Sequence, residues 1–313
     1  MLVQLSSMRD ALAEALLELG ANDPRIVVLG ADTSVSIRTS LFADRFPDRF
    51  FNVGIAEANM IGIAAGLALA GKIPYVSTYS AFVPGKCLDQ IRNAIAYPNL
   101  DVKIVSSHGG VSVGPDGASH QTVEDVAAMR AIPHMRVVIP ADAPATKVLT
   151  KESGKIPGPF YIRLSRPSVP EVYSSPPDLK FGHVKVLKEG TDLAIIACGV
   201  LVNEALEAGE FLAKEGISAE VIDSHTLKPL DADTITSVAR KTGAIVTAEE
   251  QNVIGGLGSA VAEVVSGSYP VPISMIGVRD TFGESGEYKE LMTKYGLASR
   301  DIVRAAKKLV ASR

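Results

Sequence analysis

Short apolar segments alternate with amphipathic segments along the first half of the chain. Short apolar runs bounded by turn residues are typical of buried strands, whereas a longer apolar period of about 3.6 residues predicts helices. The predicted strands are Ile26–Gly30, Phe50–Val53, Tyr75–Thr78, Val102–Ser106, Arg136–Ile139 and Phe160–Leu164. The predicted helices are Met8–Leu19, Glu57–Ala70, Lys86–Ala96, Thr122–Ala131 and Ala143–Ser153. This alternation predicts a mostly parallel sheet covered on both faces.

Residues 166–180 (RPSVPEVYSSPPDLK) are rich in Pro and Ser and have little periodicity, which predicts a linker. The strand and helix pattern then resumes. The predicted strands are Leu193–Ala197, Ala219–Ile222, Ala244–Ala248 and Ile273–Ile276, and the predicted helices are Asn203–Glu215, Asp231–Lys241, Gly258–Val265 and Ser285–Tyr295. We therefore expect an α/β protein with two mostly parallel-sheet domains, residues 1–165 and 181–313.

Composition and net charge indicate which kinds of binding partner are not expected. Hydrophobic residues make up 47% of the chain and the net charge is −4, so nucleic acid and anionic membranes are not expected partners. Cys87 and Cys198 are far apart, which disfavours disulfides and fits a reducing cytoplasm. The first residues have no signal-peptide pattern, and the apolar stretch Met60–Gly71 is shorter than the roughly 20 residues that span a bilayer.

Glu57 is the acid of an otherwise apolar, small-residue segment that follows a predicted strand. One interpretation is structural, since a glutamate in the first helical turn interacts favourably with the helix dipole. The functional interpretation is a carboxyl group held in an apolar site, where it can donate a hydrogen bond.

Two further groups lie at predicted strand ends, where ligands bind in parallel sheets. Aromatic residues are scarce, yet Tyr79 and Phe82 follow one strand; ordinary core packing is the alternative. A glycine-rich loop after the next strand carries His108, Asp116 and His120, with a spacing that fits no common zinc site.

Basic residues near the ends of other elements are candidates for binding an anion. Arg163 and Arg166 form either a solvated basic pair or an anion clamp, because guanidinium binds phosphate bidentately. Arg9 is a weaker candidate of the same kind. The glycines of 255–258 lack the residues of a phosphate-binding loop and predict a tight turn before a helix.

Taken together, these segments resemble the transketolase family. VGIAEANMIGIAAGLALAG, PYVSTYSAFVPGKCLDQIR and SSHGGVSVGPDGASHQTVEDVAAMR resemble its pyrimidine-binding domain. HTLKPLD, TAEEQNVIGGLGSAVAE and GVRDTFGESGEYKELMTKYGL resemble its C-terminal domain. The resemblance implies a thiamine-diphosphate enzyme that transfers a two-carbon ketol unit from a ketose phosphate, such as xylulose 5-phosphate, to an aldose phosphate.

The resemblance also implies roles for individual residues. Glu57 corresponds to the catalytic glutamate that hydrogen-bonds N1′ of the cofactor aminopyrimidine. His120 corresponds to a catalytic histidine that contacts the substrate near the reacting carbon, and Asp116 to a residue that binds a substrate hydroxyl. The remaining positions correspond to cofactor contacts (Tyr79, Phe82 and Asp32) and to sugar-phosphate contacts (Arg9, Ser36, His108 and Arg166).

The features by which the family binds Mg²⁺ and diphosphate, Gly-Asp-Gly and a later Asn, are not found in the sequence. The resemblance therefore implies a partner, an N-terminal transketolase subunit that holds Mg²⁺ and the diphosphate, in an α2β2 heterotetramer. Three alternatives stay open: the beta subunit of a 2-oxoacid dehydrogenase first component, the C-terminal part of a 1-deoxyxylulose-5-phosphate synthase, and an inactive regulatory subunit. The glycine-rich loop favours sugar phosphates over 2-oxoacids, and the aromatic segment favours transketolase over the synthase.

Overall fold

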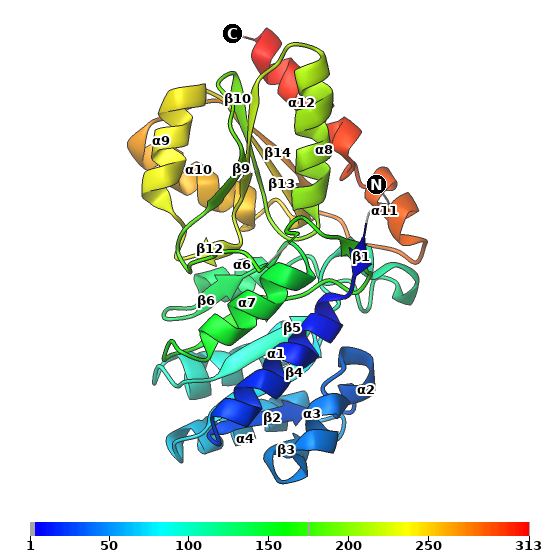
Figure 1. The fold of residues 1–313 in the computed structure, drawn as a ribbon, viewed down its shortest axis with the longest axis vertical. Coiled ribbons are helices and arrows are strands. Elements are labelled where there is room, and N and C mark those ends of the chain that lie inside the picture. Colours follow the sequence, from blue (N-terminus) through cyan, green and yellow to red (C-terminus); the bar gives the residue numbers. More distant parts are fainter. Residues whose placement is uncertain (1–3, 175, 313) are drawn as a thin grey trace.

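Two α/β bodies are stacked along the long axis of the molecule (Figure 1). The computed structural model describes residues 4–174 and 176–312. The body built from the first half of the chain contains a seven-stranded sheet, and the other body contains a five-stranded sheet. The predicted fold class, two mostly parallel α/β domains, is confirmed.

The seven-stranded sheet has the order β12-β6-β7-β5-β4-β2-β3. Its strands from the first half are β2 (Ile26–Gly30), β3 (Phe50–Asn52), β4 (Ile73–Tyr79), β5 (Lys103–Ser107), β6 (Arg136–Val138) and β7 (Phe160–Arg163). All of these neighbours pair in parallel, and only the edge strand β12 is antiparallel. The carboxyl ends of β2, β4, β5 and β7 therefore meet along one edge, where ligands bind in such sheets.

Helices cover both faces of this sheet. One face packs against α1 (Met8–Asn22), α3 (Ser40–Arg45) and α7 (Ala143–Ser153), and the other against α4 (Glu57–Leu69), α5 (Val83–Gln90) and α6 (Asp125–Ala131). Along β2, Val28 belongs to the first core, whereas Val27 and Leu29 belong to the second. This is the alternation that a strand buried on both faces requires.

The second body has the strand order β14-β13-β10-β11-β9. Its strands are β9 (Lys185–Lys188), β10 (Leu193–Ala197), β11 (Ala219–Asp223), β13 (Ile245–Asn252) and β14 (Ile273–Val278). Only β9 runs antiparallel to its neighbour. Figure 1 shows α9 (Ala232–Thr242) and α10 (Leu257–Ser268) on one side, with α8 (Leu201–Lys214) and α12 (Ser299–Ala311) on the other.

Most predicted elements are present, with differences at their ends. The strands Ile26–Gly30 and Leu193–Ala197 and the helix Ala143–Ser153 have the predicted bounds. The helix predicted over Lys86–Ala96 is wrong as a single α-helix, because α5 continues as the π-helical segment η2 (Ile91–Ala96). Several elements were not predicted from the sequence: α2 (Ser34–Ile37), α3, η1 (Pro47–Arg49), η3 (Val111–Asp116), β9, β12 (Thr226–Lys228) and α12.

The two bodies are interlocked. Strand β12 comes from the second half of the chain but pairs with β6 at the edge of the first sheet. Segment 166–180 contains β8 (Val169–Pro170), which pairs with β1 (Leu5–Ser6), and the buried Tyr173 hydroxyl donates to Asp223 Oδ2 at 2.7 Å. Both hydrophobic cores contain residues from the two halves. Among the residues that the structure describes, no helix has the length and apolar character needed to cross a membrane.

Candidate active site

The candidate residues lie at the carboxyl ends of neighbouring strands. Asp32 follows β2, Tyr79 ends β4, and His108 follows β5. Arg166 follows β7, and Glu57 begins α4 shortly after β3. The parallel topology thus gathers side chains that are more than one hundred residues apart in sequence at one edge of the sheet.

Glu57 is the first residue of α4 and is only 5% exposed. A carboxylate at this position interacts favourably with the helix dipole, and the rest of the helix offers mainly apolar contacts. Both carboxylate oxygens lie 3.4 Å from Lys86 Nζ, and this ammonium also lies 4.5 Å from the centre of the Phe82 ring. Lys86 therefore links the buried acid to the aromatic residue. It was not among the predicted residues, although its position four residues after Phe82 places the two on one helical face.

The aromatic residues form a ring cluster beside this acid. The centres of Tyr79 and Phe82 are 5.5 Å apart, and Phe82 packs edge-on against His120 at 5.2 Å. Tyr79 also lies 4.0 Å from the ring of His108, and its hydroxyl donates to Ser36 Oγ at 2.9 Å. Phe82 stays partly exposed, so part of this side chain is in contact with solvent. Both predicted aromatic residues thus lie in the site.

A cationic group lies next to these rings. Arg9 Nη1 donates to the Ser36 carbonyl at 2.8 Å, and Arg9 Nε is buried without a hydrogen-bond partner among the described residues. Burial and the nearby Arg166 lower the pKa of Arg9. Burial, followed by the charges of Arg9 and Arg166, lowers the pKa of His108 to about 3. Two guanidinium groups and a neutral imidazole therefore favour an anionic ligand.

The glycine-rich loop brings Asp116 and His120 to the same place. Gly110, Gly114 and Gly117 all have positive φ angles, between 74° and 80°, which L-residues with side chains rarely adopt. Asp116 Oδ2 lies 3.6 Å from Arg166 Nε, and Arg166 Nη1 donates to the Val113 carbonyl at 3.2 Å. The loop therefore places the Asp116 carboxylate beside Arg166 and the His120 ring against Phe82.

Asp32, a predicted cofactor contact, is exposed to solvent. It has a φ of 60°, and its backbone N–H donates to Asn52 Oδ1 at 3.0 Å. Asn52 also accepts from the N–H of Gly54 at 3.2 Å, so it links the ends of β2 and β3. Asn52 was not a predicted site residue.

Arg163 differs from both interpretations of the basic pair. It is 1% exposed, and its guanidinium contacts Asp125 Oδ2 at 2.8 Å and Glu250 Oε1 at 3.3 Å. It is therefore neither solvated nor open to an anionic ligand, and only Arg166 faces the site.

Residues 5–171 match the family model of the transketolase pyrimidine-binding domain, and residues 182–302 match that of the transketolase C-terminal domain. The chain belongs to the transketolase family. The resemblance read from the sequence is thereby confirmed.

Similar proteins include halves of transketolases encoded as separate chains. A solved structure described as "Split gene transketolase, inactive beta4 tetramer" is 50% identical, covers 97% of this chain and 98% of its own, and has a TM-score of 0.91. A Methanocaldococcus jannaschii protein named as a transketolase C-terminal section is 46% identical over 95% of this chain and 94% of its own length. A 6-deoxy-6-sulfo-D-fructose transketolase subunit from Clostridium sp. is 44% identical, with coverages of 96% and 93%.

Replacing His108 by Asn should change how stability depends on pH. Folded His108 stays neutral above about pH 3, whereas an unfolded histidine binds a proton below about pH 6.5, so stability is lost as the pH falls through this window. Asn tolerates the φ of 62° at this position. Between pH 7 and pH 5 the wild type should lose about 2 kcal/mol more unfolding free energy than His108→Asn, measured by urea denaturation. Equal losses would contradict a buried neutral histidine.

Proposed function

We propose that this chain is the C-terminal-half subunit of a split transketolase. The enzyme transfers a two-carbon ketol unit from a ketose phosphate to an aldose phosphate and uses thiamine diphosphate. The observation that carries the proposal is the buried Glu57 carboxyl group, linked through Lys86 to the ring of Phe82. A buried acid beside a flat aromatic surface suits an aminopyrimidine, which needs one hydrogen-bonding group and one stacking partner.

The residues present fit the pyrimidine end of the cofactor. When bound, thiamine diphosphate supplies the carbanion chemistry that amino-acid side chains lack. Glu57 would hold a proton at the pyrimidine N1′, Phe82 and Tyr79 would orient the ring, and Asp32 would contribute a further contact. Lys86 lies over the Phe82 ring and is 52% exposed, so its side chain is free to swing into solvent when the pyrimidine enters.

The cationic group suits the anionic end of a sugar substrate. Arg9, Ser36, His108 and Arg166 would bind the phosphate, because guanidinium groups form charge-assisted hydrogen bonds to its oxygens. Asp116 would accept from a sugar hydroxyl, and His120 would contact the oxygen near the reacting carbon as a catalytic residue. The sulfo-sugar named for one relative also carries an anionic group, which agrees with an anion site of this kind.

A partner subunit would supply Mg²⁺ and the diphosphate site. Mg²⁺ is held by several oxygen ligands, and residues 4–174 and 176–312 contain no group of three or more His, Cys, Asp or Glu side chains placed to hold a metal ion. Exposed apolar and small residues surround Glu57 and continue along α4: Ile55, Ala58, Gly62, Gly66 and Leu69. Such a patch is typical of a protein interface, which supports an α2β2 heterotetramer with an N-terminal transketolase subunit.

A separate observation supports a second kind of assembly, a homotetramer of this chain. The solved relative described as an inactive β4 tetramer indicates that a chain of this kind can associate with itself. We propose that this chain forms such an inactive homotetramer when the N-terminal subunit is absent, and that the partner converts it into the active enzyme.

Reconstitution tests the proposed function. The purified chain alone should show no transfer between xylulose 5-phosphate and ribose 5-phosphate, even with thiamine diphosphate and Mg²⁺. Adding an N-terminal transketolase subunit should restore turnover, because it completes the cofactor site. Full activity of the chain alone would refute the split site, and inactivity of the assembled pair would refute the transketolase assignment.

Arg166→Ala tests the anion site in the assembled enzyme. Loss of one charged donor should raise KM for phosphorylated sugars about 10- to 100-fold while kcat changes little. Arg166→Lys should have a KM between those of the wild type and Arg166→Ala, because an ammonium keeps the charge but lacks the planar, bidentate geometry of guanidinium. Arg25→Ala is the matched control, since Arg25 is exposed and pairs with Asp23 at the opposite, amino end of β2. An unchanged KM in Arg166→Ala would argue against the phosphate contact.

A further inference from the structure

Near its end, strand β13 carries three consecutive buried polar residues where the C-terminal body meets the first body. Glu249, Glu250 and Gln251 are each at most 1% exposed. Three adjacent polar side chains withdrawn from water are costly unless each has specific partners. The partners of the two acids differ, and this difference assigns them different functions.

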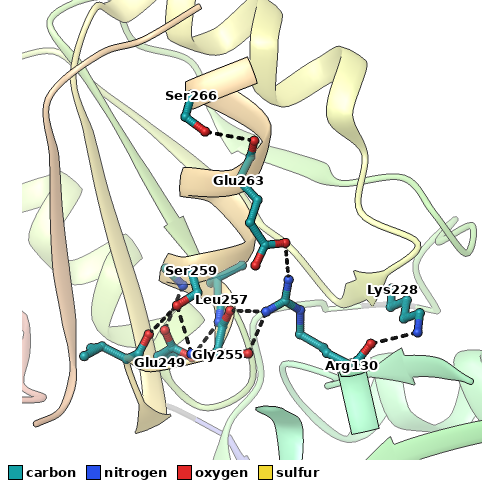
Figure 2. Close-up of polar contacts among 11 residues, drawn as sticks. Arg130, Lys228, Glu249, Gly255, Leu257, Ser259, Glu263 and Ser266 are labelled. Carbon is teal, nitrogen blue, oxygen red and sulfur yellow. Dashed lines mark hydrogen bonds and ion pairs between the residues drawn. The ribbon is translucent and has the colours of Figure 1, made fainter. Parts of the chain in front are cut away.

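The Glu249 side chain forms hydrogen bonds within its own domain. Its carboxylate accepts from the N–H of Leu257 at 2.7 Å, at the amino end of α10 (Figure 2). It also accepts from the N–H of Gly258 at 2.8 Å. It therefore satisfies backbone donors of the first helical turn, and its carboxylate occupies the amino end of the helix that the 255–258 turn introduces.

Glu250 contacts the other domain instead. One oxygen accepts from the N–H of Ser112 at 3.2 Å, and the other contacts Arg163 Nη1 at 3.3 Å and Ser165 Oγ at 3.1 Å. These partners belong to the glycine-rich loop, to the end of β7 and to the residue before Arg166. A single carboxylate of the C-terminal domain thus joins the segments that carry the substrate-facing residues.

The backbone of the glycine-rich loop packs directly against Glu250 and Arg163. A Cβ atom built on Gly110 would lie 2.5 Å from the Glu250 carboxyl group, and one built on Gly109 would lie 2.4 Å from Arg163 Nε. No side chain fits at either position, so the glycines let the backbone approach the buried charges. The loop position is consequently tied to the position of Glu250.

Arg163 is in turn fixed from its own side. Asp125 Oδ2 accepts from Arg163 Nε at 2.8 Å and from the Tyr161 hydroxyl at 2.6 Å. All three residues are at most 1% exposed. The guanidinium therefore lies between two buried carboxylates, one from each domain, in a site where charge and geometry are strongly coupled.

The far end of the loop has a second contact with the C-terminal domain. Gln121 Nε2 donates to the carbonyl groups of Gly114 and Glu284, both at 2.9 Å. The intervening segment, which contains Asp116 and His120, is thus held at both ends by residues of the other domain.

We propose that Glu250 is a positioning residue for the substrate loop, and that through it the C-terminal domain sets the affinity and turnover of the sugar substrate. Glu250 acts through Ser112 and Arg163 on the loop that carries His108, Asp116 and His120. It does not contact Glu57, Tyr79 or Phe82, so the pyrimidine site is left unchanged. The kinetic part of this proposal rests on the proposed function, whereas the structural part does not.

The test compares Glu250→Gln with a matched interdomain control, Glu263→Gln. Glu263 on α10 pairs with Arg130 of α6 at 2.9 Å, so it is also an acid of the C-terminal domain that binds an arginine of the first domain (Figure 2). It is largely exposed and does not contact the loop. Any general loosening of the two domains should appear in both variants, whereas loss of loop positioning should appear only in the first.

Two measurements give the expected result. In the full-length chain, amide hydrogen exchange of the segment that contains Ser112 should become about tenfold faster in Glu250→Gln, because its N–H loses a charged acceptor. In the enzyme assembled with the partner, kcat/KM for sugar phosphates should fall about 10- to 100-fold, while Kd for thiamine diphosphate stays within about twofold. Glu263→Gln should stay within about twofold of the wild type in every measurement.

Several outcomes would overturn the proposal. Exchange rates and kcat/KM of Glu250→Gln that match those of Glu263→Gln would remove Glu250 from this role, and so would a loss of cofactor affinity as large as the loss in kcat/KM. If Glu250→Gln does not fold, Glu250→Asp takes its place in the comparison with Glu263→Gln. The shorter side chain of Asp keeps the charge but moves it away from Ser112 and Arg163. If the wild-type assembly shows no transketolase activity, the proposed function fails, and hydrogen exchange alone decides the positioning role.

Discussion

The proposed active site depends on one constraint, the burial of the Glu57 carboxyl group at the start of an apolar helix. Burial of a carboxylate is unfavourable unless neighbouring dipoles or charges compensate, and here the amino end of α4 and the ammonium of Lys86 do so. Because Lys86 also contacts the Phe82 ring, the acid and the aromatic surface are presented together. Every other element of the proposed chemistry is arranged around this pair by the parallel strands of the first sheet.

The second domain takes part in building the first sheet and the region around its carboxyl edge. It contributes β12 to the edge of the sheet, shares both hydrophobic cores, and places Glu250 against the glycine-rich loop. The proposed substrate loop and the proposed anion site beside it are therefore positioned by contacts from both domains, although their side chains come from the first. The apolar residues left exposed along α4 form the surface to which the proposed partner chain would bind.

Most strands and helices of the first domain followed from the sequence, because buried parallel strands have a strong local pattern. The gathering of the candidate residues at one edge of the sheet also followed, because the carboxyl ends of parallel strands meet there. The contacts that define the site did not. Arg163 and Arg166 look equivalent in sequence, but Arg163 lies within β7 and points into a buried ion-pair network, whereas Arg166 follows the strand and faces the site. Glu250 and β12 were missed because their partners are distant in the chain, and no local pattern reports such pairs.

The most direct test of the central claim measures proton transfer at the cofactor. In the assembled enzyme saturated with thiamine diphosphate, exchange of the thiazolium C2 proton for deuterium can be followed by NMR for the wild type and for Glu57→Gln. If Glu57 holds the pyrimidine N1′ proton, the variant should exchange about 10²- to 10⁴-fold more slowly at an unchanged unfolding midpoint. Exchange at the wild-type rate in a folded, cofactor-saturated Glu57→Gln enzyme would contradict the role assigned to this carboxyl group.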